Sequence, residues 1–382
     1  MKKLSFIFIA FILLSCRSTE NSVERIDKKN FDWPVYRGNS SLSGIAQSQL
    51  PDKLKLLWSF QTGDDIKSSP VLGYGFLYIG STDGKIYALD AATGDSVWAF
   101  DTDDDVEAPP MLLDSTVYVG SLSGEFYALD AKTGQKKWSF LTDDEIYGSA
   151  SWVFAPNKKD RWIIVGSYDF FIYCLDAKTG EKKWAYETDN YINGAPASDG
   201  NVVVFGGCDE QLHMISIADG SEIGAVDAGS YIAGSAALVD YHAYVGHYGE
   251  SLLCIDLKKK EIAWEYNNEG TAGSFFSSPA VDEKRVVIGS RDKLVHCVDR
   301  SSGEKIWTFQ TRNDVDSSPV LCRNKVVVGS NDGRLYVLDL KTGELIWSYE
   351  IGAGIFGSPA VTGGQIFVGA EDGRVYAFGE KL

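Results

Sequence analysis

The stretch GSTDGKIYALDAATGDSVW (80–98) decides the fold of this chain, because it returns with little change as GSNDGRLYVLDLKTGELIW (329–347). Its opening glycine recurs at steps of 40 to 46 residues, and a regular period of that length marks a repeat architecture. The eight copies open at Gly80, Gly120, Gly166, Gly206, Gly246, Gly289, Gly329 and Gly369. Twelve residues after most of the tryptophans described below comes a triplet of small residues and proline, such as Ser68-Ser69-Pro70.

Each copy contains four short runs of β-forming residues, separated by turns that contain glycine. In the first copy these runs are 70–72, 76–80, 86–89 and 96–100. Some runs are apolar on both faces, as in VVVFG (202–206), which is typical of a sheet that neighbouring sheets cover on both sides. Four-stranded units of about 40 residues predict propeller blades. We therefore expect an all-β fold, an eight-bladed β-propeller of four-stranded antiparallel blades.

The turn between the third and fourth runs contains an aspartate followed four residues later by glycine, as in Asp90 and Gly94. The carboxylate can accept hydrogen bonds from the backbone of the turn, and the glycine permits a positive φ. The same pairing recurs at Asp130, Asp176, Asp299 and Asp339. We interpret these acids as structural.

A tryptophan stands 18 residues after the opening glycine in six copies, whereas the fourth copy has Gly224 there. The last copy ends at Phe378 without this strand, but LLWSF (56–60) stands ahead of the first copy. We predict that the strand around Trp58 pairs with the last blade and closes the ring, which hides sheet edges. The tryptophans of this set are Trp58, Trp98, Trp138, Trp184, Trp264, Trp307 and Trp347.

The string Ala88-x-Asp90-x-x-Thr93-Gly94-x-x-x-Trp98 resembles the tryptophan-docking motif of propellers of the pyrroloquinoline-quinone (PQQ) type. The resemblance covers residues 55–378, and WPVYRGN (33–39) is similar to a segment that precedes such repeats. It implies that each tryptophan packs between adjacent blades. The family includes quinoprotein dehydrogenases and also a lipoprotein of the outer-membrane β-barrel assembly machinery, so the resemblance alone leaves the function open.

The quinoprotein dehydrogenases use an adjacent Cys-Cys pair, a catalytic Asp and a Ca²⁺ ion, carried mostly on long insertions. This chain has no adjacent cysteines, and its insertions amount to six residues in the third copy and three before the sixth. We therefore expect no catalysis, no cofactor and no metal site. Two alternatives remain: a propeller that holds PQQ with calcium or another small ligand in its axial channel, and a cell-surface propeller that binds carbohydrate or peptide.

Residues 1–15 have the layout of a secretory signal peptide, with Lys2 and Lys3 ahead of a short apolar run. The run ends at LLSC (13–16), which resembles the bacterial lipobox. This resemblance implies cleavage before Cys16 and lipidation of its thiol, and lipid chains on one residue give stable anchoring.

Residues 16–30 are polar and have no apolar period, so we predict a flexible tether, followed by a single propeller domain at 31–382. We expect a monomer in the bacterial cell envelope, held by its lipid alone at the outer membrane and facing the periplasm.

The charge balance excludes nucleic acid as a partner. The chain has 36 Lys and Arg against 53 Asp and Glu, a net charge of −17, and loss of Lys2 and Lys3 with the signal makes it −19. A polyanion requires clusters of Lys and Arg, and no basic stripe follows the signal.

The loops that leave the fourth strand should share one face of the propeller with the loops between the second and third strands. These loops hold acids in the first three blades and aromatic residues further round, a combination that interfaces with a basic partner use. The candidate rim consists of Asp65, Asp104, Asp105, Glu107, Asp144, Glu145, Tyr147, Tyr191, Tyr231, His247, Tyr248, Phe276 and Phe356. The partners that we expect are envelope proteins, including components or substrates of β-barrel assembly.

The remaining cysteines and histidines are interpreted as structural. Cys174, Cys254 and Cys297 occupy the position of Ala88, a small buried residue of the third strand, so they are expected to be packed thiols. His213 and His296 occupy the position of Tyr87 and are expected to belong to the framework.

Overall fold

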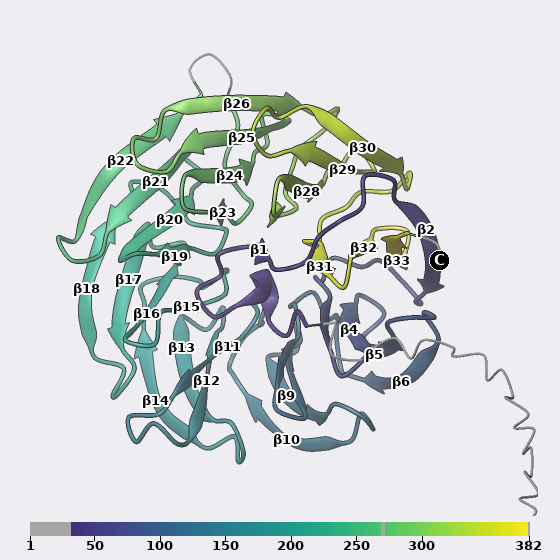
Figure 1. The fold of residues 1–382 in the computed structure, drawn as a ribbon. Helices are drawn as coiled ribbons and strands as arrows, with labels where there is room; N and C mark the ends of the chain where they lie inside the picture. The colour runs from purple at the N-terminus through teal and green to yellow at the C-terminus, as the bar shows by residue number, and fades with distance from the viewer. Residues whose placement is uncertain (1–31, 269–271, 381–382) are drawn as a thin grey trace, which may run out of the picture.

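The computed structural model describes residues 32–268 and 272–380; the predicted signal peptide, Cys16 and tether lie outside this part. Its strands form eight sheets around a central axis (Figure 1). Each blade contains four antiparallel strands, which follow sequence order from the axis outward in the first seven blades, so the predicted eight-bladed propeller is confirmed. No helix in the described residues has the length and apolar character needed to cross a membrane.

The strands of the first four blades have the following bounds. The first blade consists of β3 (Val71–Gly73), β4 (Phe76–Ser81), β5 (Lys85–Asp90) and β6 (Ser96–Asp101). The second consists of β7 (Met111–Leu113), β8 (Thr116–Gly120), β9 (Glu125–Asp130) and β10 (Lys136–Leu141). The third consists of β11 (Ser151–Phe154), β12 (Arg161–Gly166), β13 (Phe171–Asp176) and β14 (Lys182–Glu187). The fourth consists of β15 (Ala197–Ser198), β16 (Val202–Gly206), β17 (Gln211–Ser216) and β18 (Glu222–Asp227).

The other four blades continue the ring. The fifth consists of β19 (Ala237–Val239), β20 (His242–Gly246), β21 (Ser251–Asp256) and β22 (Glu261–Asn267). The sixth consists of β23 (Ala280–Val281), β24 (Arg285–Gly289), β25 (Leu294–Asp299) and β26 (Lys305–Gln310). The seventh consists of β27 (Val320–Cys322), β28 (Lys325–Gly329), β29 (Arg334–Asp339) and β30 (Leu345–Glu350), with β1 (Ile45–Ala46) parallel to β27. The eighth consists of β31 (Ala360–Thr362), β32 (Gln365–Ala370), β33 (Arg374–Gly379) and β2 (Lys55–Gln61).

The second strand of each blade is buried over nearly its whole length, whereas the outermost strand is more exposed to solvent. Every residue of β8 is buried, while β6 alternates between exposed and half-buried positions along its second half. Apolar side chains on both faces of the inner strands therefore pack against two neighbouring blades, as the continuous apolar runs predicted.

The ring closes as predicted. Strand β2 pairs antiparallel with β33, with Trp58 opposite Ala377 and Phe60 opposite Val375. The strand from the N-terminal side thus completes the blade that the last three strands begin, which leaves no unpaired strand edge between the two ends of the ring.

The predicted docking tryptophans join adjacent blades. The indole N–H of Trp98 donates a hydrogen bond of 3.1 Å to the carbonyl of Ala131, and its ring lies against Gly134 in the next blade. A Cβ at Gly134 would lie 2.8 Å from the ring, and φ is +71° there, so a side chain is excluded on both counts. The equivalent indole hydrogen bonds start from Trp58, Trp138, Trp184, Trp264 and Trp307. Trp347 also faces the next blade, which is the last one, and there its ring lies 5.5 Å from the ring of Phe378.

The joint between the fourth and fifth blades lacks this pair. Gly224 takes the place of the tryptophan, and Lys260, with φ +59°, takes the place of the glycine. The ammonium group of Lys260 donates to the carbonyl of Ile223 at 2.5 Å and fills the space that an indole occupies elsewhere. Both partners of the docking contact therefore differ from those at the six joints that have the tryptophan and glycine pair.

Residues 33–48 cover one end of the central channel, and we call them the axial plug. They contain the 3₁₀ turn η2 (Tyr36–Gly38) and β1, which lie at the centre of the ring in Figure 1. The plug's carbonyls accept hydrogen bonds from backbone N–H groups of the innermost strands, at Pro34, Ser40, Ser41, Ser43 and Gly44. The axial plug therefore satisfies backbone donors that the channel would otherwise expose.

Arg37 fixes the plug at the axis. Its side chain is fully buried and donates to the carbonyls of Ser318 and Pro279, each at 3.1 Å. Burial lowers the pKa of Arg37 to about 10. Because both of its partners are backbone carbonyls, the plug is held by the main chain of the sixth and seventh blades.

Candidate functional site

The two sets of loops predicted to share a face are joined by hydrogen bonds in every blade. In the first blade the N–H of Thr82 donates to the carbonyl of Asp65 at 3.0 Å, and in the second that of Leu122 donates to Asp105 at 2.9 Å. The same bond recurs from Tyr168, Cys208, Tyr248, Arg291, Asn331 and Glu371. We call this side the funnel face and the opposite side, which carries the axial plug, the plug face.

A cavity of about 520 Å³ opens on the funnel face, at the end of the channel that the plug leaves free. Tyr36 of the plug lines its inner end, where the hydroxyl contacts the hydroxyls of Ser278 at 3.2 Å and Ser318 at 3.1 Å. The cavity is thus a funnel with a polar floor.

The small-residue triplets of the sequence surround this floor. The N–H of Ser358 donates to the hydroxyl of Ser69, that of Ser318 to Ser358, and that of Ser278 to Ser318. Each bond links one blade to the next, so the serines form an arc of hydrogen bonds around the axis. Small side chains are needed here because eight blades converge.

One wall of the funnel is made of tyrosines from the third and fourth blades. The ring centres of Tyr147 and Tyr168 lie 4.5 Å apart, and those of Tyr168 and Tyr191 lie 4.8 Å apart. The hydroxyl of Tyr168 donates to the side-chain oxygen of Asn193. Tyr191 at the outer end of this tyrosine wall is 41% exposed, so the wall runs from the cavity to the surface.

The facing wall combines aromatic rings with a cation. Phe276 lies 6.0 Å from Tyr248 and 5.8 Å from Phe356, between ring centres. The guanidinium of Arg291 lies 4.1 Å from the ring centre of Phe276 and is held by Asp316 at 2.8 Å. We call these residues the arginine wall.

Acidic residues of the first three blades border the tyrosine wall. Lys67 pairs with Glu107 at 2.7 Å, and this hydrogen bond raises the pKa of Lys67. The pKa of Asp105 is also raised, first by burial and then by the neighbouring carboxylates of Asp104 and Glu107. At Asp105, each of these two carboxylates therefore has a larger effect on the pKa than the base Lys67 has.

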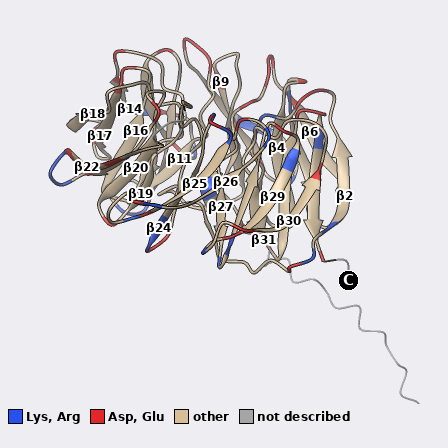
Figure 2. Ribbon diagram, turned by 90° about the horizontal axis from the view of Figure 1, so that it is seen from above, with Lys and Arg blue, Asp and Glu red and all other residues tan. Residues whose placement is uncertain are grey.

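The two faces differ sharply in charge. The funnel-face loops are 62–68, 102–108, 142–148, 188–194, 228–234, 272–276, 311–317 and 351–357, with the turns 82–84, 122–124, 168–170, 208–210, 248–250, 291–293, 331–333 and 371–373. They hold twenty-one Asp and Glu and four Lys and Arg. The turns that join first to second and third to fourth strands, on the plug face, hold eleven of each sign. Figure 2 shows acidic residues along the loops at the upper edge of the disk.

The candidate rim residues fall into three groups. Those that line the cavity are Glu107, Tyr147, Tyr231, Tyr248, Phe276 and Phe356. Those on the loops around its mouth are Asp65, Asp104, Asp105, Asp144, Glu145 and Tyr191. His247 is buried, 5% exposed, and its Nδ1 accepts a hydrogen bond from the N–H of Gly249 at 2.9 Å, so it lies outside the cavity lining.

The structure adds cavity residues that sequence reasoning missed. They are Lys67, Tyr168, Asn193, Cys208 and Asp316. Tyr168 and Cys208 stand two residues after the opening glycine of their copies, and Lys67, Asn193 and Asp316 share the column of Tyr147. Aligning these two columns across the eight copies would have found them.

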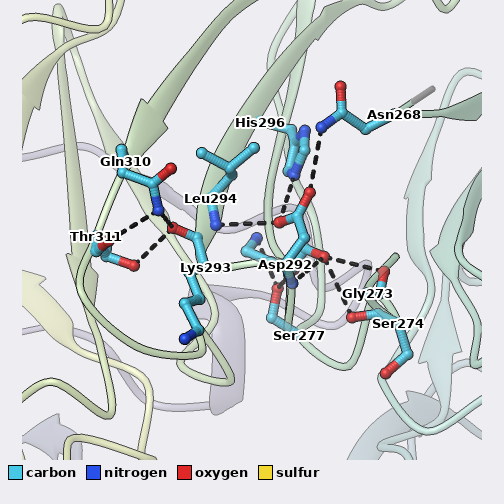
Figure 3. Close-up of polar contacts among 12 residues, drawn as sticks. Asn268, Gly273, Ser274, Ser277, Asp292, Lys293, Leu294, His296, Gln310 and Thr311 are labelled. Atoms are coloured by element: carbon cyan, nitrogen blue, oxygen red, sulfur yellow. Dashed lines mark hydrogen bonds and ion pairs between the residues drawn. The ribbon is translucent and has the colours of Figure 1, made fainter. Parts of the chain in front are cut away.

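The predicted framework histidines, His213 and His296, occupy the position that a tyrosine occupies in other blades. The hydroxyl of Tyr87 donates to Asp83 at 2.6 Å, and a ring nitrogen of His296 lies 3.1 Å from Asp292 in the equivalent place (Figure 3). Although burial opposes it, the contact with His296 lowers the pKa of Asp292. His213 and Asp209 form the same pair at 2.7 Å.

The cysteines of the described residues are all free. Cys174, Cys254 and Cys297 are buried as predicted, and burial raises the pKa of Cys254 to about 11. Cys208 is half-buried beside the funnel, where it accepts a hydrogen bond from the amide of Asn193 at 2.9 Å.

A family model described as outer membrane protein assembly factor BamB matches residues 51–153, 148–230, 208–321 and 291–381. The chain belongs to this family. Among curated proteins, no match was found.

Solved structures similar to this member of the BamB family include a BamB protein and two dehydrogenases. BamB from Moraxella catarrhalis is 20% identical, with a TM-score of 0.72, and the match covers 86% of this chain and all of that one. The quinohemoprotein alcohol dehydrogenase from Comamonas testosteroni is 15% identical, with a TM-score of 0.78 over 93% of this chain and 82% of that one. A europium-containing methanol dehydrogenase is 14% identical, with a TM-score of 0.74 over 91% and 98%. These likenesses establish the shared fold.

Within the described residues, the carboxylates of the funnel do not form a group that could hold a metal ion. Ca²⁺ takes six to eight oxygen ligands, and no group of three or more His, Cys, Asp or Glu in metal-binding geometry occurs within 32–268 and 272–380. The carboxylates that line the cavity are engaged, Glu107 with Lys67 and Asp316 with Arg291. This member of the BamB family therefore presents its aromatic rings and charges to the opening.

Proposed function

We propose that the chain is a non-catalytic, lipid-anchored scaffold that binds other proteins of the bacterial envelope through its funnel face, in outer-membrane protein assembly. The observation that carries this proposal is the combination of exposed tyrosines and uncompensated acids around one opening. Tyr191, Tyr231 and Tyr248 are each more than 40% exposed there. Protein interfaces favour aromatic side chains, and surface charge steers association with a partner of opposite sign.

The place of Asp32 supports this arrangement. The N–H of Asp32 donates to Thr362 at 3.0 Å, next to the β31–β32 turn of the plug face. A chain of n residues spans at most about 3.3–3.6 Å × n, so residues 17–31 would reach roughly 50 Å from a lipidated Cys16. The lipid anchor would then be attached on the side of the plug face, and the funnel face would remain accessible to partners.

The proposal is tested by photo-crosslinking in cells that produce the whole lipoprotein. A photoreactive phenylalanine replaces Tyr191 on the funnel face, or Tyr241 on the plug face as a matched control of 54% exposure. Envelope proteins should be captured several-fold more strongly from position 191, and replacing Asp104, Asp105 and Asp144 by Ala should reduce that yield. Equal capture from both positions would count against the proposal.

Lipidation is tested separately. Replacing Cys16 by Ser should abolish incorporation of labelled fatty acid and release the protein from the membrane fraction, since the anchor is the proposed attachment. A variant that keeps the label, or stays in the membrane fraction after a carbonate wash, would contradict the lipid anchor.

A further inference from the structure

The two aromatic walls of the funnel differ in one respect. The arginine wall carries a cation of this chain, because Arg291 lies 4.1 Å from the ring centre of Phe276 and 6.0 Å from that of Tyr248. Of the Lys and Arg residues that the structure describes, none lies over the rings of the tyrosine wall. The tyrosine wall is therefore a stack of π faces without a cation.

Carboxylates stand beside this wall. Glu145 lies two residues before Tyr147 on the same loop, and Asp105 occupies the equivalent position in the preceding blade. Within the described chain neither forms an ion pair, whereas Glu107 is paired with Lys67. In the arginine wall, Asp316 holds a guanidinium against aromatic rings, so the tyrosine wall presents the same groups with the cation missing.

The volume of the funnel is large enough for a side chain and too small for a folded domain. Pockets that enclose small ligands measure about 300–1,000 Å³, and the funnel measures about 520 Å³. A loop or tail could insert one or two residues while its flanks rest on the exposed Tyr191 and Tyr231.

We infer that the funnel receives a Lys or Arg side chain from a basic segment of a partner protein, seated against the tyrosine wall and paired with Glu145 and Asp105. This inference rests on the proposed function and names the chemistry of its partner. The funnel-face loops are strongly acidic, so a cationic segment is attracted and an anionic ligand is repelled. A cation over an aromatic face changes affinity by a factor of about 2 to 30.

The test uses the whole lipoprotein in detergent and a labelled hexapeptide, acetyl-Gly-Leu-Arg-Phe-Arg-Gly-amide, with a twin in which citrulline replaces both arginines. Citrulline has nearly the same shape without the charge. Fluorescence anisotropy should show saturable binding of the arginine peptide with a Kd below about 1 mM. The citrulline peptide should bind at least about fivefold more weakly, and higher salt should narrow this difference.

Two variants locate the contact. Glu145→Gln and Tyr191→Leu should each weaken binding of the arginine peptide about 3- to 10-fold and leave the citrulline peptide nearly unchanged. The matched plug-face variants Glu304→Gln and Tyr241→Leu, both at exposed positions, should bind like the wild type.

Equal affinity for the two peptides, no binding of either, or unchanged affinity in both funnel variants would each overturn the inference. The peptide comparison is made on the wild-type protein, so it does not depend on how a variant folds. If position 191 captures envelope proteins but the peptides bind equally, the proposed function survives and the basic side chain is wrong. If the peptides differ but nothing is captured, the cation site stands and the envelope role fails.

Discussion

Installing a tryptophan at the joint between the fourth and fifth blades should stabilise the ring. The change is Gly224→Trp together with Lys260→Gly, which recreates the pair seen at six other joints. A Trp at 224 without the second change would meet the side chain of Lys260, since a Cβ there lies 2.9 Å from its Cδ and Nζ.

The magnitude follows from the interactions that the double substitution creates and those that it removes. An indole hydrogen bond to the carbonyl of Leu257 contributes about 0.5–1.5 kcal/mol, and burying roughly 100 Å² of the ring contributes about 2.5 kcal/mol. Removing a left-handed lysine at φ +59° relieves about 1 kcal/mol. Loss of the Lys260 to Ile223 hydrogen bond, ordering of the indole and the freedom of a new glycine cost about 2–3 kcal/mol together. The net expected gain is about 1–3 kcal/mol.

Urea unfolding of the wild type, both single variants and the double variant measures this gain and the coupling between the two positions. Coupling is expected because the two residues touch, with each single variant less stable than the double variant. A double variant within about 0.5 kcal/mol of the wild type, or two single effects that simply add, would refute the docking account.

Three further outcomes are expected. Replacing Arg37 by Met should destabilise the protein by about 2–4 kcal/mol in urea unfolding, because two buried carbonyls, of Ser318 and Pro279, lose their donor; a loss below about 0.5 kcal/mol would show that the plug is not held there. Burial lowers the pKa of His247, so the folded state takes up this proton less readily than the unfolded state, and stability should be full above about pH 6.5 and fall as the pH drops below it. Urea midpoints at pH 7.5 and 5.5 should therefore differ more for the wild type than for His247→Asn, and equal differences would contradict this assignment. A maleimide should label the native protein at Cys208, the half-buried cysteine of the described residues, and Cys208→Ser should remove that reaction; labelling that persists in the variant would place a reactive thiol elsewhere.

Much of the fold could be predicted because the sequence pattern of one blade occurs eight times along the chain. The first-blade strands were predicted within one residue at each end, and the closing pair of Trp58 with the last blade followed from counting strands. The Asp90 turn also formed as expected, with its carboxylate accepting from the N–H groups of Ala92 and Thr93. Such features depend on residues close in sequence or on a fixed spacing, and both are visible in one line of text.

The sequence alone therefore determined the number of blades, the closure of the ring and the face on which the acids and aromatic rings gather. Only the tertiary structure decided which of them meet. The ring brings together loops that are 21 and 23 residues apart in the sequence, so Tyr147, Tyr168 and Tyr191 form a single wall, whereas His247 is buried. The position of the axial plug could not be predicted for a different reason. The plug accepts hydrogen bonds from the inner strands through its backbone carbonyls, and every residue type has such a carbonyl.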